Sequence, residues 1–162
     1  MSLNLVSLIN FTNEWTIFLL AAVLFIRIYK FHKDKLTDFI AATIIGGFTS
    51  EVIKYFVNRP RPEMSFIYQS TFEGSSFPST HVTIAFTIAF FFAITCHGLS
   101  RKDRGEGDRY FAILGLFLAT MVAILRILTH AHYPVDIFAG IILGFIISLL
   151  FVFYDVTLRK IK

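Results

Sequence analysis

Five apolar runs of membrane-spanning length constrain the fold of this chain more than any other feature. A helix of about 20 apolar residues crosses the ~30 Å hydrocarbon core of a bilayer. The runs cover residues 15–31, 37–57, 77–98, 110–128 and 133–154. Segment 1–13 is too short to span and mixes apolar with polar residues, which is typical of an interfacial helix. We predict an all-α fold, a polytopic membrane bundle of five transmembrane helices plus a short N-terminal interfacial helix.

Composition supports a membrane protein. Hydrophobic residues make up 56% of the 162 residues and charged residues only 16%, whereas soluble domains average about a quarter charged. The length fits a single domain, 1–162. With Cys96 as its single cysteine, the chain has neither an internal disulfide framework nor a thiol metal site. The basic residues lie at the ends of apolar runs rather than along one face, so we predict no nucleic-acid partner.

The basic residues also give the chain an orientation. Loops between successive spans alternate between the two sides of the membrane. Eleven of the 15 Lys and Arg residues fall on one side, in segments 27–35, 99–109 and 155–162. The positive-inside rule makes that side cytoplasmic. The other side receives Lys54, Arg59, Arg61 and Arg126. Topology does not require these four residues, so we predict that they serve chemistry on the face away from the cytoplasm.

Two polar clusters border the spans on that face. Residues 54–62 supply Lys54 and Arg61, a point charge and a planar fork that suit phosphate oxygens. Residues 78–81 begin the third span, with Pro78 suited to its first turn. Unpaired N–H groups at a helix N-terminus attract anions, and Ser79 and His81 add a hydroxyl and an imidazole. Taken singly, these residues also fit lipid-headgroup contacts and a helix cap.

The third cluster, residues 126–136, joins the last two spans. If Tyr133 opens a helix, with Pro134 in its first turn, His132 and Asp136 lie about one turn apart. The carboxylate can then hold the imidazole in one tautomer, as in other nucleophile–base–orienter sets. We expect His130 to be a bystander or a substrate contact. In the first cluster's helix, we expect Glu51 to pair with Lys54 one turn later.

Together the three clusters have the composition of a phosphoryl-transfer site. Cations offset the charge on phosphate oxygens, one histidine attacks and the other protonates the leaving group. The cations disfavour a metal ion, and His130, His132 and Asp136 lack a dedicated fourth ligand. We therefore predict no metal and no other cofactor. The alternative is a membrane transporter or channel with an anion-binding site, which predicts charges spread through the membrane depth.

The spacing of these clusters resembles the type 2 phosphatidic acid phosphatases, or lipid phosphate phosphatases. That family's pattern is Lys-x6-Arg-Pro, Pro-Ser-Gly-His and Ser-Arg-x5-His-x3-Asp. This chain has Lys54-x6-Arg61-Pro62, Pro78-Ser79-Thr80-His81 and Leu125-Arg126-x5-His132-x3-Asp136. The resemblance covers about residues 36–155. Thr80 and Leu125 replace the usual Gly and Ser, which bears on substrate fit more than on activity. Arg59-Pro60 is a competing pair, but its distance from Lys54 does not fit the pattern.

The resemblance implies a role for each matched residue. His132 is the expected nucleophile that forms a phosphohistidine, and Asp136 is expected to orient it. His81 is the expected acid for the leaving group and later activates water. The expected phosphate-binding residues are Lys54, Arg61, Ser79, Thr80 and Arg126. The expected activity is that of a metal-independent phosphoric-ester or pyrophosphate hydrolase.

A membrane lipid is the expected substrate, because short loops leave little protein to enclose a soluble one. Undecaprenyl pyrophosphate, lipid A 1-phosphate and phosphatidylglycerol phosphate all fit, and the sequence does not decide among them. Compact bacterial members of the family often resemble undecaprenyl pyrophosphate phosphatases or lipid A 1-phosphatases. We expect a multi-pass protein of the bacterial inner membrane, with its active site facing the periplasm or the outside.

Overall fold

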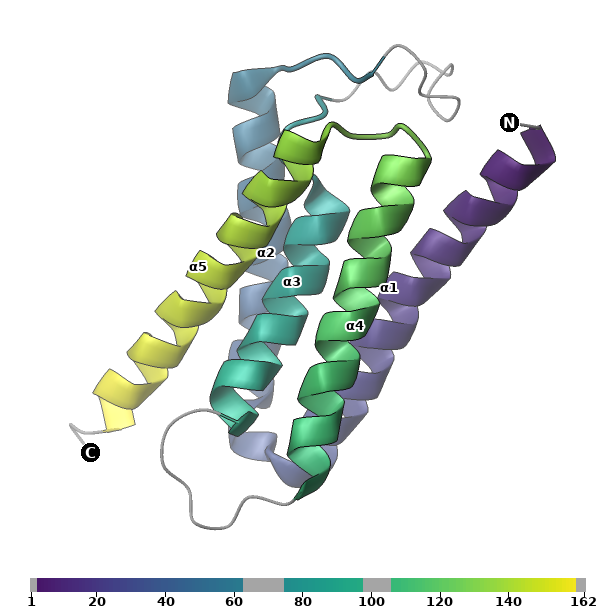
Figure 1. Ribbon diagram of the computed structural model, residues 1–162. Coiled ribbons are helices and arrows are strands. Elements are labelled where there is room, and N and C mark those ends of the chain that lie inside the picture. The colour runs from purple at the N-terminus through teal and green to yellow at the C-terminus, as the bar shows by residue number, and fades with distance from the viewer. Residues whose placement is uncertain (1–2, 63–74, 98–105, 160–162) are drawn as a thin grey trace.

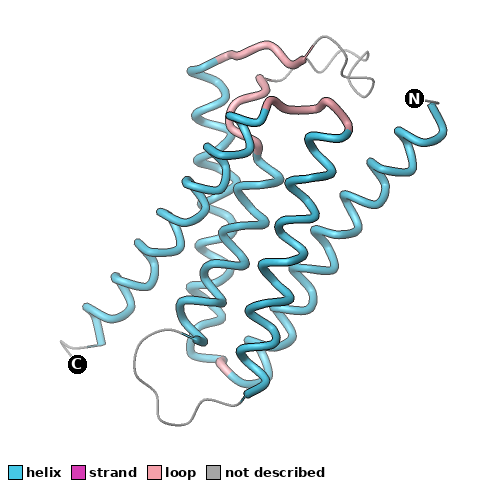
Figure 2. Tube along the Cα trace, viewed as in Figure 1, coloured by secondary structure: helices cyan, strands magenta, loops and turns pink. Residues whose placement is uncertain are grey.

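Five long helices run up and down along roughly one direction and form a single bundle (Figure 1). The structure, a computed structural model, describes residues 3–62, 75–97 and 106–159. The elements in chain order are α1 (Leu3–Phe31), a 3₁₀ turn η1 (Lys33–Lys35), α2 (Leu36–Val57), α3 (Thr80–Phe92), a π-helical segment η2 (Ala93–His97), α4 (Glu106–Leu128) and α5 (Pro134–Arg159). The described residues contain no strand (Figure 2), which confirms the predicted all-α class.

Helix α3 is the core of the bundle. It packs against all four other long helices, and most of its side chains from Val82 to Phe92 are buried. A helix that is hydrophobic all round is stable only when it is surrounded by other apolar surface. The packing of α3 inside the bundle therefore follows from its sequence, and it fixes the N-terminus of α3 at the centre of one end.

Helices α3 and α5 approach each other most closely through glycines of α5. A Cβ atom on Gly144 would lie 2.8 Å from the backbone nitrogen of Thr87 and 2.9 Å from the carbonyl oxygen of Thr83. One turn earlier, Gly140 lies against Ser79 in the same way. Small residues four positions apart let membrane helices pack backbone against backbone. This contact holds the start of α5 beside the start of α3.

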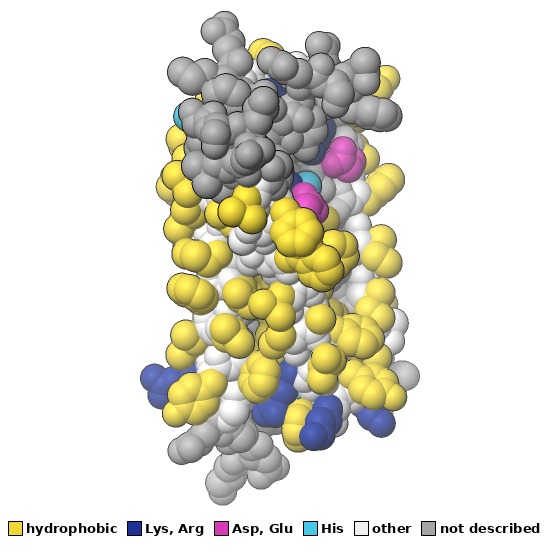
Figure 3. Space-filling view, turned by 90° about the vertical axis from the view of Figure 1, so that its right-hand side faces the viewer, with side chains coloured by type: hydrophobic (Ala, Val, Ile, Leu, Met, Phe, Trp, Pro, Cys, Tyr) yellow, Lys and Arg dark blue, Asp and Glu magenta, His cyan; other side chains and the backbone are white. Residues whose placement is uncertain are grey.

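The outer surface of the bundle is suited to lipid. Four helices are long and apolar enough to cross a membrane, over Phe11–Phe31, Lys33–Val57, Gly107–Leu128 and Pro134–Tyr154. The shorter apolar helix, Thr80–Thr95, is the central one. On the face drawn in Figure 3, a hydrophobic band separates Lys and Arg side chains at one end from a mixed group of acidic, His and basic side chains at the other. The chain is a multi-pass membrane protein.

A polar cluster ties α1 to α4 at the end opposite the motif residues. Asp108, which is 6% exposed, pairs with Arg27 at 2.8 Å and with His32 at 3.2 Å. The Arg27 guanidinium also lies 3.9 Å from the centre of the Phe31 ring. A buried carboxylate with two such partners has its hydrogen-bonding needs met, so this cluster anchors the C-terminal part of α1.

The predicted boundary between segment 1–13 and the first span is absent. Residues 3–31 form one continuous helix, α1, because neither Gly nor Pro interrupts this stretch. Asn13, which marked the expected boundary, is buried at 1% exposure. Its polar side chain is satisfied against Arg126 of α4, as described below, and does not end the helix.

Other helix boundaries differ from the predicted ones by a few residues. Helix α3 begins at Thr80 rather than at 77, because the segment before it is hydrogen-bonded to the loop after α2: Ser76 N–H donates to Arg59 O at 2.8 Å. Pro78 therefore precedes the helix and does not belong to its first turn. Helix α4 begins at Glu106, four residues before the predicted start, and α5 continues to Arg159.

Candidate active site

The three polar clusters meet at one end of the bundle. Helices α1, α3 and α5 begin at this end and α2 and α4 end at it, as the ribbon shows (Figure 1). The clusters are therefore presented by helix termini and by the two connections between them. The geometry of each connection explains where its side chains lie.

The connection from α4 to α5 begins with a Schellman turn. His130 has a positive φ of 52°, its N–H donates to Ile127 O at 2.9 Å, and Ala131 N–H donates to Arg126 O at 3.2 Å. This pair of hydrogen bonds, with a residue in left-handed conformation just after the helix, is a standard way for a helix to end. The exposed residue His130 therefore ends α4, which accounts for it without a role in chemistry.

The start of α5 is fixed by Asp136. One of its carboxylate oxygens accepts a hydrogen bond from Tyr133 N–H at 2.8 Å, which is one half of a capping box. Pro134 is the first residue of the helix, so the predicted start is confirmed. The Asp136 side chain is fully buried, and its other oxygen pairs with Arg59 Nη1 at 3.0 Å. Both oxygens of this carboxylate are thus engaged.

His132 lies between these two turns and is only 4% exposed. Its Nδ1 lies 2.7 Å from Ser76 O and 3.7 Å from the nearer Asp136 oxygen. Nδ1 therefore hydrogen-bonds to the backbone carbonyl oxygen. The sequence predicts the Asp136 carboxylate as its partner, but Tyr133 and Arg59 already engage that carboxylate. Since a carbonyl only accepts, Nδ1 carries the proton, and Nε2 of the neutral ring keeps its lone pair.

The surroundings of His132 favour its neutral form. Burial is the largest influence and lowers the pKa of His132 below the usual value for histidine. The positive charges of Arg61 and Arg126 lower this pKa as well, while the nearby Asp136 carboxylate and the hydrogen bond to Ser76 O oppose the shift. A neutral imidazole with a free Nε2 lone pair is the form that acts as a nucleophile.

Two arginines reach this connection from the loop after α2. Helix α2 ends at Val57 and is capped by Asn58, in left-handed conformation (φ 44°), and the chain then runs beside residues 75 and 76. Arg59 stacks over the Tyr133 ring at 4.3 Å in addition to pairing with Asp136. Arg61 Nη1 donates to Ala131 O at 3.0 Å, next to His132. Arg59, which the spacing argument set aside, therefore belongs to the site together with Arg61.

The Pro-Ser-Thr-His segment, residues 78–81, ends the connection from α2 to α3 and begins α3. Ser79 Oγ is buried and has no hydrogen-bond partner among residues 3–62, 75–97 and 106–159, whereas Ser79 N–H donates to Asp136 O at 3.1 Å. Thr80 Oγ1 donates to Glu51 Oε1 at 2.5 Å, and the same oxygen accepts from Lys54 Nζ at 3.0 Å. The expected pair of Glu51 and Lys54 is thus present, and Thr80 joins it to α3.

No group of three His, Cys, Asp or Glu side chains that could hold a metal ion occurs within the described parts of the chain. The site has instead the character of an anion site, with cationic side chains from α2, the loop after it and α4. Arg126 is buried at 2% exposure, and buried guanidinium groups are suited to phosphate oxygens.

A family model described as the PAP2 superfamily matches residues 35–160, a range that contains all three clusters. The chain belongs to the PAP2 superfamily. This confirms the family predicted from the spacing of the motifs.

Two curated relatives of this PAP2 protein cover different shares of it. The bacitracin transport permease protein BcrC of Bacillus licheniformis is 40% identical over 80 residues, which are 49% of this chain and 33% of that protein. The undecaprenyl-diphosphatase of Sulfolobus acidocaldarius is 27% identical over 146 residues, which are 86% of this chain and 64% of that protein. The chain thus spans one third to just under two thirds of the length of these relatives.

Two crystal structures share the fold. LpxE of Aquifex aeolicus superposes with a TM-score of 0.67 at 22% identity, over 94% of this chain and 87% of that one. A transmembrane PAP2 type phosphatidylglycerolphosphate phosphatase of Bacillus subtilis gives a TM-score of 0.69 at 20% identity, over 100% and 80%. At these identities the likeness establishes the fold alone.

Sequence reasoning missed two site residues on α1, a helix that precedes the part of the chain matched to the PAP2 family. Glu14 Oε1 lies 3.0 Å from His81 Nε2 and 3.2 Å from Arg126 Nη2. Asn13 lies against the same guanidinium. With its amide oxygen turned toward Arg126, it accepts from Nε at 2.7 Å and from Nη2 at 3.2 Å. The only signal in the sequence was a carboxylate near the start of an apolar run.

Proposed function

We propose that this protein is a lipid phosphatase that removes the terminal phosphate of a lipid phosphate or pyrophosphate on the extracytoplasmic face. The observation that supports this proposal most directly is the tautomer of His132: its Nδ1–H donates a hydrogen bond to Ser76 O, so Nε2 keeps its lone pair. This nucleophile stands among cationic groups that favour a phosphate. Family membership and the name of the undecaprenyl-diphosphatase relative support the same activity.

In the first step, His132 Nε2 attacks phosphorus as the bond to the leaving oxygen breaks. His81 gives its proton to that oxygen, and a phosphohistidine forms. Lys54, Arg61 and Arg126 offset the charge on the other phosphate oxygens, and the unpartnered hydroxyl of Ser79 is available as a donor. The carboxylate of Asp136, 3.7 Å from Nδ1, stabilises the positive charge that the ring gains.

In the second step, water attacks the phosphohistidine. His81, which is now neutral, takes a proton from the water as the new phosphorus–oxygen bond forms and the phosphorus–nitrogen bond breaks. Inorganic phosphate leaves, and His132 returns to its neutral state. Neither step requires a metal ion.

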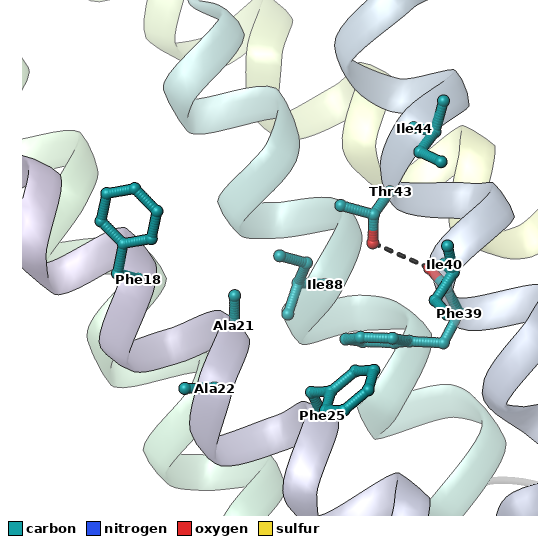
Figure 4. Close-up of a pocket in the computed structure, with 9 residues that line it drawn as sticks. All are labelled: Phe18, Ala21, Ala22, Phe25, Phe39, Ile40, Thr43, Ile44 and Ile88. Atoms are coloured by element: carbon teal, nitrogen blue, oxygen red, sulfur yellow. Dashed lines mark hydrogen bonds between the residues drawn. The ribbon is translucent and has the colours of Figure 1, made fainter.

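An apolar groove between α1 and α2 supports a lipid substrate. The groove measures about 360 Å³, and its floor includes Ile88 of α3 (Figure 4). Its one polar lining group, Thr43 Oγ1, donates to Phe39 O and is already satisfied. On α1, Phe18 of the groove lies one turn from Glu14, and on α3, Ile88 lies two turns from His81. At about 5.4 Å per turn, a hydrocarbon tail in this groove reaches the polar site.

The distribution of charge supports an active site away from the cytoplasm. Eleven of the 15 basic residues fall in segments that the positive-inside rule places in the cytoplasm. Those that the structure describes lie at the end of the bundle opposite the site: Arg27, Lys30, Lys33, Lys35, Arg109 and Arg159. We propose the bacterial inner membrane as its location, with undecaprenyl pyrophosphate, lipid A 1-phosphate and phosphatidylglycerol phosphate as the candidate substrates.

A channel or transporter is less well supported. An ion path needs charged or strongly polar groups through the depth of the membrane. In α2, α4 and α5 the Asp, Glu, Lys and Arg residues lie near the two helix ends, and α3 has none. In α1 the one such residue away from the ends is Glu14, which lies at the level of the motif residues His81 and Arg126. The name of the bacitracin transport permease relative is the main argument for transport.

Release of inorganic phosphate by the detergent-purified protein tests the proposed function. The three candidate lipids are offered separately with a chelator present, and His132→Ala is the blank. We expect release from at least one lipid, unchanged by the chelator, and none from His132→Ala. Labelling of the wild type by a lipid that carries ³²P in its terminal phosphate, quenched with detergent at alkaline pH, checks the phosphohistidine: the label should survive alkali and be lost in acid.

The outcomes separate the parts of the proposal. Turnover by His132→Ala would remove the nucleophile assignment, and activity that the chelator abolishes and a divalent ion restores would revive a metal mechanism. Hydrolysis of one lipid alone would identify the substrate class. The absence of release from every lipid would favour transport.

A further inference from the structure

Glu14 brings a negative charge into a site that is otherwise built to attract an anion. Its carboxylate is about half exposed (51%) and contacts the two groups that the proposed function assigns to proton transfer and phosphate binding, His81 at 3.0 Å and Arg126 at 3.2 Å. It comes from α1, outside the range matched to the family. Such a contact needs an explanation beyond charge neutralisation.

The position of Glu14 is fixed by the packing of α1. Its neighbour Asn13 is buried against Arg126. Further along the helix, Leu20, Leu24 and Ile28 are fully buried, and Arg27 pairs with Asp108 at the far end. The helix is therefore held along most of its length, and the carboxylate is presented to His81 by a rigid element.

The hydrogen bond decides which nitrogen of His81 carries the proton. An ionised carboxylate only accepts hydrogen bonds, so the contact requires N–H at Nε2. In the neutral ring Nδ1 is then unprotonated, and in the protonated ring Nδ1–H is the donor that remains. The other nearby carboxylate, Glu51, is occupied by Thr80 and Lys54. Glu14 is thus the carboxylate that holds this imidazole.

We infer that Glu14 is a positioning residue for His81: it holds the imidazole through Nε2 and leaves Nδ1 to exchange the proton. The inference rests on the proposed function. In the first step the Nδ1 proton goes to the leaving oxygen as its bond to phosphorus breaks. In the second step Nδ1 takes a proton from the attacking water. Glu14 stays ionised throughout, in the manner of the third member of a catalytic triad.

Two substrates with different leaving groups test this role. The leaving group of dodecyl phosphate is an alkoxide, which needs a proton. The leaving group of p-nitrophenyl phosphate is a stable phenolate, which does not. The quantity to compare is kcat/KM, because it reports the steps up to the first irreversible one, formation of the phosphohistidine. We expect Glu14→Ala to lower kcat/KM for dodecyl phosphate by about 10-fold to 100-fold and to leave the aryl value nearly unchanged.

Two further variants keep the test interpretable. Glu14→Gln retains an oxygen that accepts from Nε2–H, so it should recover part of the lost rate. Thr12→Ala is the matched control on the same helix, because Thr12 is exposed and its hydroxyl donates to Leu8 O of its own helix. It should leave both substrates unaffected. Unfolding temperatures of all variants show whether the bundle is intact.

A readout independent of turnover is the ¹⁵N spectrum of histidine-labelled protein, with His81 assigned by the loss of its signals in His81→Asn. We expect the Nε2–H form in the wild type and a mixture of tautomers in Glu14→Ala. Equal losses of kcat/KM for both substrates, or no loss, would overturn the inference. So would higher kcat/KM for both with tighter inhibition by inorganic phosphate, because the carboxylate would then occupy the phosphate position.

Failure of the proposed function has a different signature. In that case the wild type releases no phosphate from either substrate, or His132→Ala releases as much as the wild type. A wild type that is active and depends on His132, with no effect of Glu14→Ala, would reject the role of Glu14 alone.

Discussion

The Nδ1–H group of His132 donates a hydrogen bond to the backbone carbonyl oxygen of Ser76, with 2.7 Å between the two atoms. The proposed nucleophile is therefore oriented by the segment that precedes α3, and not by hydrogen bonding to the carboxylate one turn after it. Asp136 has three other tasks: it caps α5, accepts from Arg59 and places negative charge near the ring. A backbone acceptor cannot be removed by mutation, so tests of this arrangement must act on its surroundings.

We predict that acid destabilises the protein partly through His132. Burial holds the pKa of His132 below that of the unfolded chain, which is about 6.5. The unfolded state therefore binds more protons between these two values, so stability is fully present above about pH 6.5 and is lost as the pH falls through the folded pKa. The unfolding temperature should drop as the pH is lowered from about 6.5 to about 5.5, and the acid limb of kcat/KM should lie below about 6.5.

The matched variant for this prediction is His132→Asn, whose amide N–H keeps a donor near the position of Nδ1 without a titrating group. Its unfolding temperature should fall less over the same pH interval than that of the wild type. Parallel pH dependence in the two proteins would show that His132 does not titrate differently in the folded state.

Replacing Arg59 should destabilise the site and slow turnover. Arg59→Leu removes a partner of the fully buried Asp136 carboxylate, with which it pairs at 3.0 Å. Loss of one member of a buried pair costs about 3–5 kcal/mol, but Arg59 is 35% exposed, so we expect about 1–3 kcal/mol. At roughly 2–4 °C per kcal/mol, the unfolding temperature should fall by about 2–12 °C.

A double-mutant cycle with Asp136→Asn isolates this ion pair. If the two side chains act together, the effect of Arg59→Leu on unfolding should shrink once Asp136 is neutral. Additive effects would mean that Arg59 acts mainly through its stacking on Tyr133. Arg59→Lys keeps the charge and loses the planar stack, so it separates the two contributions.

Gly144→Ala should loosen the contact between α3 and α5. The added Cβ would meet backbone atoms at 2.8 and 2.9 Å, and backbone cannot move aside as a side chain can. The helices must separate, which should cost about 1–3 kcal/mol. Because α5 carries Asp136 and follows His132, activity should fall together with the unfolding temperature.

Gly47→Ala is the matched control. It also adds one methyl group within a described helix, but its nearest neighbour is the terminal methyl of the Ile84 side chain, at 3.3 Å. The gain in helix propensity, up to about 1 kcal/mol, should offset the crowding. Equal losses in the two variants would show that close backbone approach is not what Gly144 provides.

Much of the architecture could be predicted from local sequence. A run of about 20 apolar residues implies a membrane helix because only a helix satisfies its own backbone in lipid. Pro134 at a first helical position and the spacing of His132 and Asp136 placed the start of α5 correctly. The three motif clusters fell at one end because successive helices alternate in direction.

The contacts between helices were decided by the tertiary structure alone. In a membrane protein apolar residues cover the lipid-facing surface as well as the core: Phe48 is 69% exposed, whereas Phe92 is fully buried. Periodicity therefore does not indicate how far each helix is rotated toward its neighbours. The pairing of Glu14 with His81, of Arg59 with Asp136 and of His132 with Ser76 O depends on those rotations, across 56 to 77 residues of chain. The sequence determined which groups are available at this end, and packing decided which of them touch.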